Sequence, residues 1–406
     1  MIRISKHTTR FNNINKQNLL NEFIDEYKQT VEFYINHLFP LITYETYETP
    51  KFISTKHTFP NNTKLSQRAL KCAATQACGM INAQTAKPRK VIYTINKLQK
   101  ENKDVSNLQK WLSNYKFSKP KINDNYKCEL NSICCDLKQS KNFLFLQLKS
   151  LGKYYGKIRI PLKQHKRSNK WKAQGITLNS FLVSKNYVDI RYEIETSLKE
   201  EGKVVGADQG KNTCLSLSDG QVTKTNKHGY DLNSILDLMS KRVKGSKGFK
   251  RCQEHRKNYI NWSINQLNFQ DIKKINLERL KDVRRGKSNS RLMSHWTYTL
   301  IKDKLVRVGE EQKVFVVEQS CVYRSQRCNQ CGMVRKSNRI GKLYCCNSCG
   351  YVGDADINAS LNHEIDLPDV DYLRGKNYNL EGFYWKPSGV YDFCHEEITV
   401  PHTIKL

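Results

Sequence analysis

The sequence of 406 residues lacks any stretch that approaches the ~20 consecutive apolar residues of a membrane-spanning helix. Its first residues, Met1 to Thr8, also lack the apolar segment of a secretory signal peptide. Acidic residues are scarce, since 38 Asp and Glu stand against 69 Lys and Arg, a formal net charge of +31. A compact chain with this excess repels itself unless a polyanion neutralises it, and only nucleic acid or an anionic membrane does so at scale. The composition therefore predicts a soluble, cytoplasmic protein with a nucleic acid partner and no membrane partner.

The 14 cysteines do not form the pattern of an extracellular disulfide framework, and most are expected to be reduced thiols. Two Cys-x-x-Cys pairs are the exception, because each pair turns tightly enough to aim both sulfurs at one tetrahedral Zn²⁺. Gly332 and Gly350 follow the pairs and permit the positive φ of such turns. Cys345 is an alternative ligand, but Cys346 restores the two-residue gap and is preferred. The predicted zinc ligands are Cys328, Cys331, Cys346 and Cys349.

Hydrophobic periodicity divides the first 200 residues into a helical and a strand-rich part. A short strand is predicted at residues 2–5, and apolar residues then recur every three or four positions, as in amphipathic helices. Pro88 is expected to break the helical pattern. Later segments alternate apolar and polar residues, which predicts an antiparallel sheet or small barrel that the first strand joins across the helical insertion. The helices are expected at residues 15–38, 64–82 and 88–114, and the later strands at 128–131, 143–148, 156–161, 171–176 and 187–194.

The next region has the element order of an RNase H-like domain. A three-strand meander is predicted across residues 203–225, and a helical stretch follows at 231–268 with a split at Gly245–Gly248. A strand at 271–278, a helix at 291–308 and a strand at 313–318 complete the order. From Asp366 the tail is acidic, aromatic and loop-like, and its role cannot be read from the sequence.

Three carboxylates stand where elements of this region end or begin. Asp208 and Glu278 each close an apolar strand, and Asp356 opens a helix after the second cysteine pair. An RNase H-like nuclease needs carboxylates from separate elements to hold two divalent ions, and hard oxygen ligands select Mg²⁺ or Mn²⁺. Each residue alone is equally consistent with a turn or cap, Asp356 as a helix N-cap in particular. Their order and context make the nuclease hypothesis the more specific one.

The motifs around these residues resemble the split RuvC-like nuclease and inserted zinc ribbon of the transposon-associated TnpB proteins and the similar compact type V CRISPR effectors. The resemblance covers residues 203–362, in the segments Gly206–Asn212, Ile275–Leu280, Tyr323–Gly332 and Tyr344–Ala359. It implies an RNA-guided DNA endonuclease that cuts both strands of target double-stranded DNA at one site, as a monomer or homodimer on one guide RNA. By position, the metal-binding triad would be Asp208, Glu278 and Asp356, with Asp354 as a neighbour.

The resemblance also implies a multidomain α+β architecture, with two Mg²⁺ or Mn²⁺ ions and one structural Zn²⁺. Over the first 200 residues only the layout agrees, and this half would hold the guide RNA and read a short motif flanking the target. Ala207 and Gln209 depart from the family pattern, which usually has apolar residues there. The implied domains are a wedge-like β-barrel (1–14 and 117–200), a helical recognition lobe (15–116), a RuvC-like nuclease (201–320 and 354–406) and a zinc ribbon (321–353).

Basic residues suggest where nucleic acid binds. A cluster in the long helical stretch is predicted to contact it, with a solvated basic face as the alternative; its members are Arg242, Lys244, Lys247, Lys250, Arg251, Arg256 and Lys257. Arg324 and Arg327 flank the first cysteine pair and are candidate clamps on the scissile phosphate. Two other functions use the same fold: a nuclease-silent RNA-guided repressor, and a transposase or recombinase that joins DNA ends.

Overall fold

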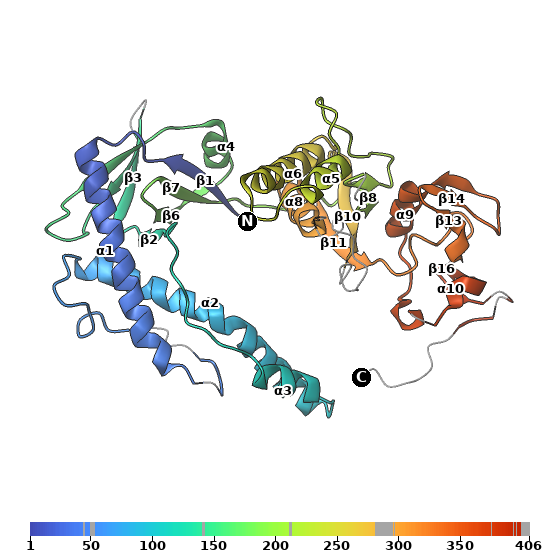
Figure 1. Ribbon diagram of the computed structural model, residues 1–406, viewed down its shortest axis with the longest axis horizontal. Helices are drawn as coiled ribbons and strands as arrows, with labels where there is room; N and C mark the ends of the chain where they lie inside the picture. Colours follow the sequence, from blue (N-terminus) through green and yellow to red (C-terminus); the bar gives the residue numbers. More distant parts are fainter. Residues whose placement is uncertain are drawn as a thin grey trace. The chain divides into compact units, whose positions relative to one another are not determined.

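The computed structural model divides the chain into two compact units, Met1–Glu195 and Thr196–Ile404, each of which is treated by itself (Figure 1). The structure describes residues 1–43, 45–48, 53–139, 143–210, 213–280, 295, 297–374, 376–392, 394 and 396–398.

The first unit contains two antiparallel sheets. The larger has the order β1-β7-β6-β2, and the smaller has the order β3-β4-β5. Strand β1 pairs with β7 from Ile2 opposite Glu193 to Thr8 opposite Tyr187, which confirms that the first strand joins the sheet across the helical insertion. The strands are β1 (Ile2–Thr8), β2 (Cys128–Asn131), β3 (Cys135–Gln139), β4 (Leu144–Leu148), β5 (Ile158–Leu162), β6 (Ile176–Val183) and β7 (Tyr187–Glu193).

Two predictions for this unit were wrong. In the described residues the strands form separate sheets and no closed barrel. The predicted strand at 171–176 is mostly helix α4 (Lys166–Gln174), because the side chain of His165 and that of Ser168 cap its first turn reciprocally.

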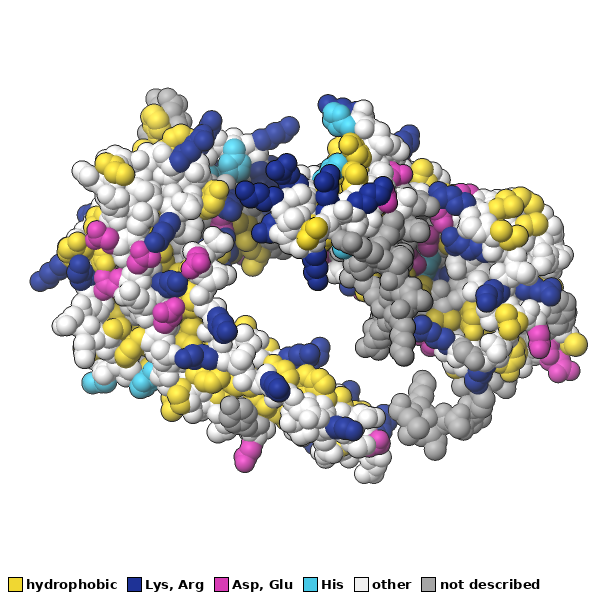
Figure 2. All heavy atoms as spheres, viewed as in Figure 1, with side chains coloured by type: hydrophobic (Ala, Val, Ile, Leu, Met, Phe, Trp, Pro, Cys, Tyr) yellow, Lys and Arg dark blue, Asp and Glu magenta, His cyan; other side chains and the backbone are white. Residues whose placement is uncertain are grey.

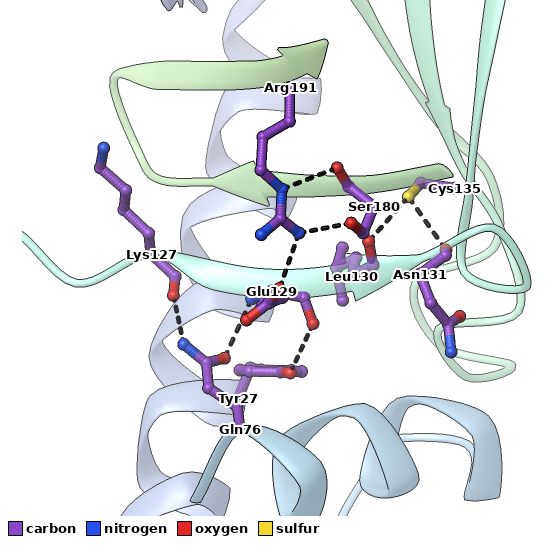
Figure 3. A network of polar contacts seen from close by, with 9 residues as sticks. All are labelled: Tyr27, Gln76, Lys127, Glu129, Leu130, Asn131, Cys135, Ser180 and Arg191. Atoms are coloured by element: carbon purple, nitrogen blue, oxygen red, sulfur yellow. Dashed lines mark hydrogen bonds and ion pairs between the residues drawn. The ribbon is translucent and has the colours of Figure 1, made fainter. Parts of the chain in front are cut away.

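Helix α2 covers the edge of β2, which is a reason why that edge does not pair with another strand (Figure 3). The side-chain amide of Gln76 on α2 makes the two hydrogen bonds that a neighbouring strand would make. It donates to the carbonyl of Lys127 at 2.8 Å and accepts from the N–H of Glu129 at 2.9 Å. The hydroxyl of Tyr27 on α1 donates to the carbonyl of Glu129 at 3.1 Å, and Arg191 on β7 donates to its carboxylate at 2.6 Å. These bonds satisfy the backbone groups of an edge strand and attach the helices to the sheet.

The helical part of this unit consists of α1 (Ile14–Leu38), the 3₁₀ turn η1 (Phe39–Leu41), α2 (Gln67–Lys100) and α3 (Ser106–Ser113). Helix α1 agrees with its prediction, whereas α2 continues through Pro88, where a break was expected. Proline removes the N–H that would bond the carbonyl of Gln84. The hydroxyl of Tyr115 approaches that carbonyl at 3.5 Å and partly takes the place of the missing donor.

A mixed sheet of order β11-β10-β8-β9 forms the centre of the second unit. Strand β10 (Ile272–Arg279) runs parallel to β8 (Lys203–Asp208) and β11 (Phe315–Ser320), and β9 (Ser216–Leu217) runs antiparallel to β8. The predicted third meander strand is reduced to one bridge between Ser216 and Val222. The predicted helical split is confirmed, since α5 (Leu232–Ser240) and α6 (Lys247–Asn265) are separate. Helix α8 (Tyr298–Gln312) precedes β11, and the start of the helix predicted at 291–308 lies outside the described residues.

The cysteine-rich segment and the tail complete this unit. The segment contains β12 (Met333–Val334), η2 (Lys336–Asn338), β13 (Arg339–Ile340), β14 (Leu343–Cys345) and β15 (Val352–Asp354), and leads into helix α9 (Ala355–Glu364). The tail forms η3 (Asp371–Leu373), α10 (Tyr378–Glu381), β16 (Phe383–Lys386) and β17 (Gly389–Tyr391).

The tail is more than the loop that its composition suggests. Strand β16 pairs with β12, and Trp385 is buried with Val334 and Phe383 in a small core of its own. The indole N–H of Trp385 donates to the carbonyl of Pro368 at 3.1 Å. The tail therefore packs against the cysteine-rich segment and stabilises it.

Candidate nuclease centre and thiol cluster

Four cysteine sulfurs from two turns meet in the second unit. The sulfur atoms of Cys328, Cys331, Cys346 and Cys349 all lie within 4.8 Å of one another. The Cys328–Cys349 and Cys331–Cys346 pairs are each 3.6 Å apart. Zinc–sulfur bonds of ≈ 2.3 Å in a tetrahedron place sulfurs about 3.8 Å apart, so the cluster fits a Zn²⁺ site. Cys345 lies on β14 opposite Val352 and outside this group, which supports the choice of Cys346.

Backbone geometry explains how the turns close. Gly332 and Gly350 have φ of 82° and 73°, and their N–H groups donate to the carbonyls of Cys328 and Cys346, both at 3.0 Å. A side chain at either glycine would strain this left-handed conformation. The two turns can thus have the same shape because each carries a glycine at the same place.

Asp208 and Glu278 lie side by side at one edge of the mixed sheet. Their strands are parallel neighbours in which Ala207 pairs with Leu277, so the next residue of each strand lies at the same level. A carboxylate oxygen of Asp208, one of Glu278 and a ring nitrogen of His363 lie within 4.8 Å of one another. The N–H of Gln209 donates to Glu278 at 2.7 Å and fixes its orientation. The structure thus brings two of the three predicted carboxylates together.

Burial and nearby negative charge raise the pKa of both carboxylates. Burial, followed by the charge of Asp356, raises the pKa of Asp208 to about 7. Burial, followed by the charge of Asp208, raises the pKa of Glu278 well above its usual range. The positive charge of Arg339 opposes both shifts. Carboxylates with raised pKa values that lie close together are typical of functional sites.

Asp356 lies in the first turn of α9, close enough for its charge to act on the other two carboxylates. The N-cap of the helix is Asp354, whose Oδ1 accepts from the N–H groups of Asp356 at 2.8 Å and Ile357 at 3.0 Å. The carboxylate of Asp356 is therefore not used as the cap. It forms an ion pair at 2.9 Å with Arg339, and the Lys342 ammonium is 4.0 Å away.

Helix α9 lies directly on β8, as Figure 1 shows, and a glycine makes this approach possible. A Cβ atom at Gly206 would lie 1.9 Å from the carbonyl oxygen of Ser360 and 2.5 Å from the nitrogen of Glu364. The amide of Asn276 on β10 also donates to the carbonyl of His363 at 3.0 Å. The lack of a side chain at Gly206 thus lets α9 bring Asp356 and His363 to the end of β8.

Arg339 and His363 were missed by sequence reasoning. Nothing in the sequence links Arg339 on β13 to Asp356, because only folding of the cysteine-rich segment brings them together. His363 did leave a signal, since it lies seven residues after Asp356 and therefore on a similar face of a helix. Burial, followed by the charge of Arg324, lowers the pKa of His363 to about 3, so its ring is neutral.

Arg324 and Arg327 are interior residues that position backbone. They are 5% and 3% exposed. Arg324 donates to the carbonyls of Ser320 at 3.0 Å and Ile365 at 3.3 Å. Arg327 donates to the carbonyl of Trp385 at 2.7 Å and to the side chain of Asn362 at 2.5 Å. These contacts join α9, the first cysteine turn and the tail, and they speak against a direct contact with a scissile phosphate.

Six of the seven predicted basic contacts are exposed, and they lie on α6 or just before it: Arg242, Lys244, Lys247, Lys250, Arg251 and Lys257. Figure 2 shows Lys and Arg side chains gathered over α5 and α6. Arg256 is different, because it is buried and donates to the carbonyl of His295. The prediction that Arg256 contacts nucleic acid therefore conflicts with its position.

Comparison with known proteins gives the centre its context. A family model described as Cas12f1-like, TNB domain matches residues 298–363. The CRISPR-associated endodeoxyribonuclease Cas12f1 of Sulfoacidibacillus thermotolerans is 32% identical over 126 residues, which is 31% of this chain and 28% of that protein. Cas12f1 of Syntrophomonas palmitatica is 30% identical over 125 residues, 30% of this chain and 24% of that protein. The matched segment thus spans less than a third of each relative.

A cryo-EM structure of a Cas12f1-sgRNA-target DNA complex aligns with 87% of this chain and 82% of that chain, at a TM-score of 0.50 and 14% identity. This likeness concerns the fold. The chain resembles the compact type V, TnpB-like effectors. The Cas12f1-like segment includes the four clustered cysteines, Asp356 and His363, whereas Asp208 and Glu278 lie before it. Within the described ranges, no helix combines the length and apolar character needed to cross a membrane.

Proposed function

We propose that this protein is an RNA-guided endonuclease that cleaves double-stranded DNA with one nuclease centre. The observation that carries the proposal is the convergence of Asp208 and Glu278, with Asp356 nearby, in a chain that resembles Cas12f1. The two Cas12f1 relatives are endodeoxyribonucleases by name, which supports DNA as the substrate. The similar fold of Cas12f1 in complex with sgRNA and target DNA supports a guide RNA and target DNA as partners.

The donor atoms fit the ions that such a nuclease uses. Asp208, Glu278 and Asp356 offer hard oxygen ligands, and burial together with neighbouring carboxylate charge raises the pKa of the first two. These residues would hold two Mg²⁺ or Mn²⁺ ions, and the four clustered cysteines would hold a structural Zn²⁺. When bound, divalent ions at such a centre polarise the phosphate and activate water.

The residues around the centre prepare it for an anionic substrate. The N–H of Gln209 holds the carboxylate of Glu278 in one orientation, and Arg339 supplies positive charge beside Asp356. The exposed basic residues of α6 would bind the nucleic acid backbone without reading its sequence. Guide pairing would choose the target, together with a short flanking motif.

The domain assignment remains part of this proposal. Residues 15–116 would form the recognition lobe, and residues 1–14 and 117–200 would form a wedge domain built of two sheets. Residues 201–320 and 354–406 would form the nuclease domain, with the zinc ribbon at 321–353. Protein purified with its guide, as a monomer or as a homodimer, is the species to assay.

The test separates cutting from binding. Asp208→Ala, Glu278→Ala and Asp356→Ala should each abolish cleavage of a matched target while the affinity for guide RNA and target persists. Asp303→Ala, at an exposed position on α8, is the matched control and should cut like the unaltered protein. Full cleavage by all three variants would refute the nuclease centre.

Two other functions have distinct outcomes in the same assay. A guided repressor would bind the target and leave it intact even with the triad unaltered. A transposase or recombinase would yield joined DNA ends in place of broken ones. RNA that copurifies with the protein can be sequenced to identify the guide.

A further inference from the structure

The imidazole of His363 occupies a place that the nuclease triad does not explain. The residue is 1% exposed, and one of its ring nitrogens shares the cluster with oxygens of Asp208 and Glu278. Its Nδ1 atom is buried and has no hydrogen-bond partner in the described part of the chain. A buried polar atom without a partner is destabilising, so a ligand at this nitrogen is favoured.

We propose that His363 supplies a ring nitrogen to the divalent ion held by Asp208 and Glu278, so that this position of the nuclease centre selects Mn²⁺ over Mg²⁺. The inference rests on the proposed function and adds to it the nature of one metal site. A site made of oxygen ligands alone suits Mg²⁺ as well as Mn²⁺. An imidazole ligand shifts the preference toward transition metals.

The spacing of the three donors suits one shared ion. Ligands at about 2.0–2.1 Å from an octahedral ion are about 3 Å apart when adjacent and about 4 Å apart when opposite. The three donor atoms lie within 4.8 Å of one another, which leaves room for an ion with small side-chain movements. The donors come from β8, β10 and α9, three elements packed together in one unit.

The backbone around His363 holds the ring in place. The amide of Asn276 donates to its carbonyl, and α9 packs closely against β8 at Gly206. Rigid elements on both sides favour a ligand, because a preorganised donor loses little freedom on binding. A hydrogen bond from the ring to a carboxylate is the alternative role, in which His363 only positions Asp208 or Glu278.

Pulsed EPR of bound Mn²⁺ distinguishes the two roles. The whole chain, with its zinc retained, is loaded with one equivalent of Mn²⁺ and measured in frozen solution. A coordinated imidazole nitrogen gives ¹⁴N modulations, and these should be present. Growth with ¹⁵N-histidine should replace them with ¹⁵N features, and this measurement needs no mutation.

A pair of histidine variants gives the matched control. In His363→Leu the nitrogen modulations should disappear and the Mn²⁺ affinity should fall about tenfold or more, whereas the Mg²⁺ affinity should fall less. His228→Leu changes an exposed histidine and should keep both the modulations and the affinities. Zinc content and circular dichroism identical to those of the unaltered protein establish that His363→Leu is folded.

The outcomes separate this inference from the proposed function. Absence of nitrogen modulations in the unaltered protein, with Mn²⁺ binding still lost in Asp208→Ala, overturns the role of His363 and leaves the nuclease centre standing. Mn²⁺ binding that persists in Asp208→Ala and Glu278→Ala overturns the metal centre itself. Nitrogen modulations that persist in His363→Leu also overturn the inference, because another histidine then supplies them.

Discussion

Asp208→Asn should stabilise the second unit at neutral pH when no divalent ion is bound. In the folded protein the pKa of Asp208 is raised from 3.8 to about 7 by burial and by the charge of Asp356. The unfolded chain loses the proton near pH 4, whereas the folded chain retains it until about pH 7. The folded state therefore binds more protons across this window, and stability falls as the pH rises through it. Above pH 7 the loss is complete, and asparagine avoids it.

The magnitude follows from the shift. A change of about three pKa units corresponds to about 4 kcal/mol, since each unit is worth 1.36 kcal/mol. The Asp208 side chain is partly exposed, so solvent screens part of this, and we expect a gain of about 2 kcal/mol at pH 8. For a unit of about 200 residues, that gain raises the midpoint of thermal unfolding by about 4–8 °C.

Thermal unfolding from pH 4 to pH 8 in buffer free of Mg²⁺ and Mn²⁺ measures this gain. Chelators are avoided because they would remove zinc, and Asp303→Asn on α8 is the control for loss of an exposed carboxylate. The difference should be near zero at pH 4, grow to pH 7 and stay level above it. Mn²⁺ should stabilise the unaltered protein and reduce the advantage of Asp208→Asn, because an ion that binds only the folded state stabilises it. A difference that is independent of pH would refute the reasoning.

Three further predictions concern the surroundings of this centre. Arg339→Gln removes a charge that lowers the pKa of Asp208, so the loss of stability in the same titration should extend above pH 7; an unchanged midpoint would contradict this. Cys346→Ser should lose zinc, whereas Cys345→Ser should retain it, as elemental analysis of purified protein would show; the reverse result would exchange the two roles. Trp385→Ala should destabilise the tail by about 3–5 kcal/mol, seen as faster hydrogen exchange there, since the indole is 1% exposed; unchanged protection would contradict its place in the core.

Local sequence patterns correctly predicted those parts of the fold that depend on neighbouring residues. The two Cys-x-x-Cys pairs with their glycines specify a turn whose shape needs no distant partner, so the grouping of the four cysteines was predictable. The split between α5 and α6 followed in the same way from Gly245, which has a φ of 87° and lies in the gap, whereas Gly248 is inside α6. By contrast, Pro88 predicts a break that does not occur. The hydroxyl of Tyr115 approaches the carbonyl of Gln84, which Pro88 leaves without a donor. Tyr115 lies 27 positions after Pro88, so local sequence could not reveal this contact.

The prediction of a closed barrel was wrong for a related reason. Alternating residues predict strands but do not say which edges pair, and here the amide of Gln76 on α2 takes the edge of β2. Arg324 and Arg327 also looked like residues of the centre, because charge next to a motif suggests contact with substrate. Their burial depends on the tail, whose role the sequence left open.

The sequence by itself determined the candidate ligand groups of this protein: the excess of positive charge, the four thiols at fixed spacing, and three carboxylates placed where strands end or a helix begins. Residue types and short spacings suffice for these features, because ligand chemistry and turn geometry are local. Only the tertiary structure decided that His363 stands beside Asp208 and Glu278 and that Arg339 faces Asp356. The first contact joins segments far apart in the chain, and it exists because α9 packs onto β8 where Gly206 leaves room. The second depends on the folding of the cysteine-rich segment, which brings β13 beside the start of α9.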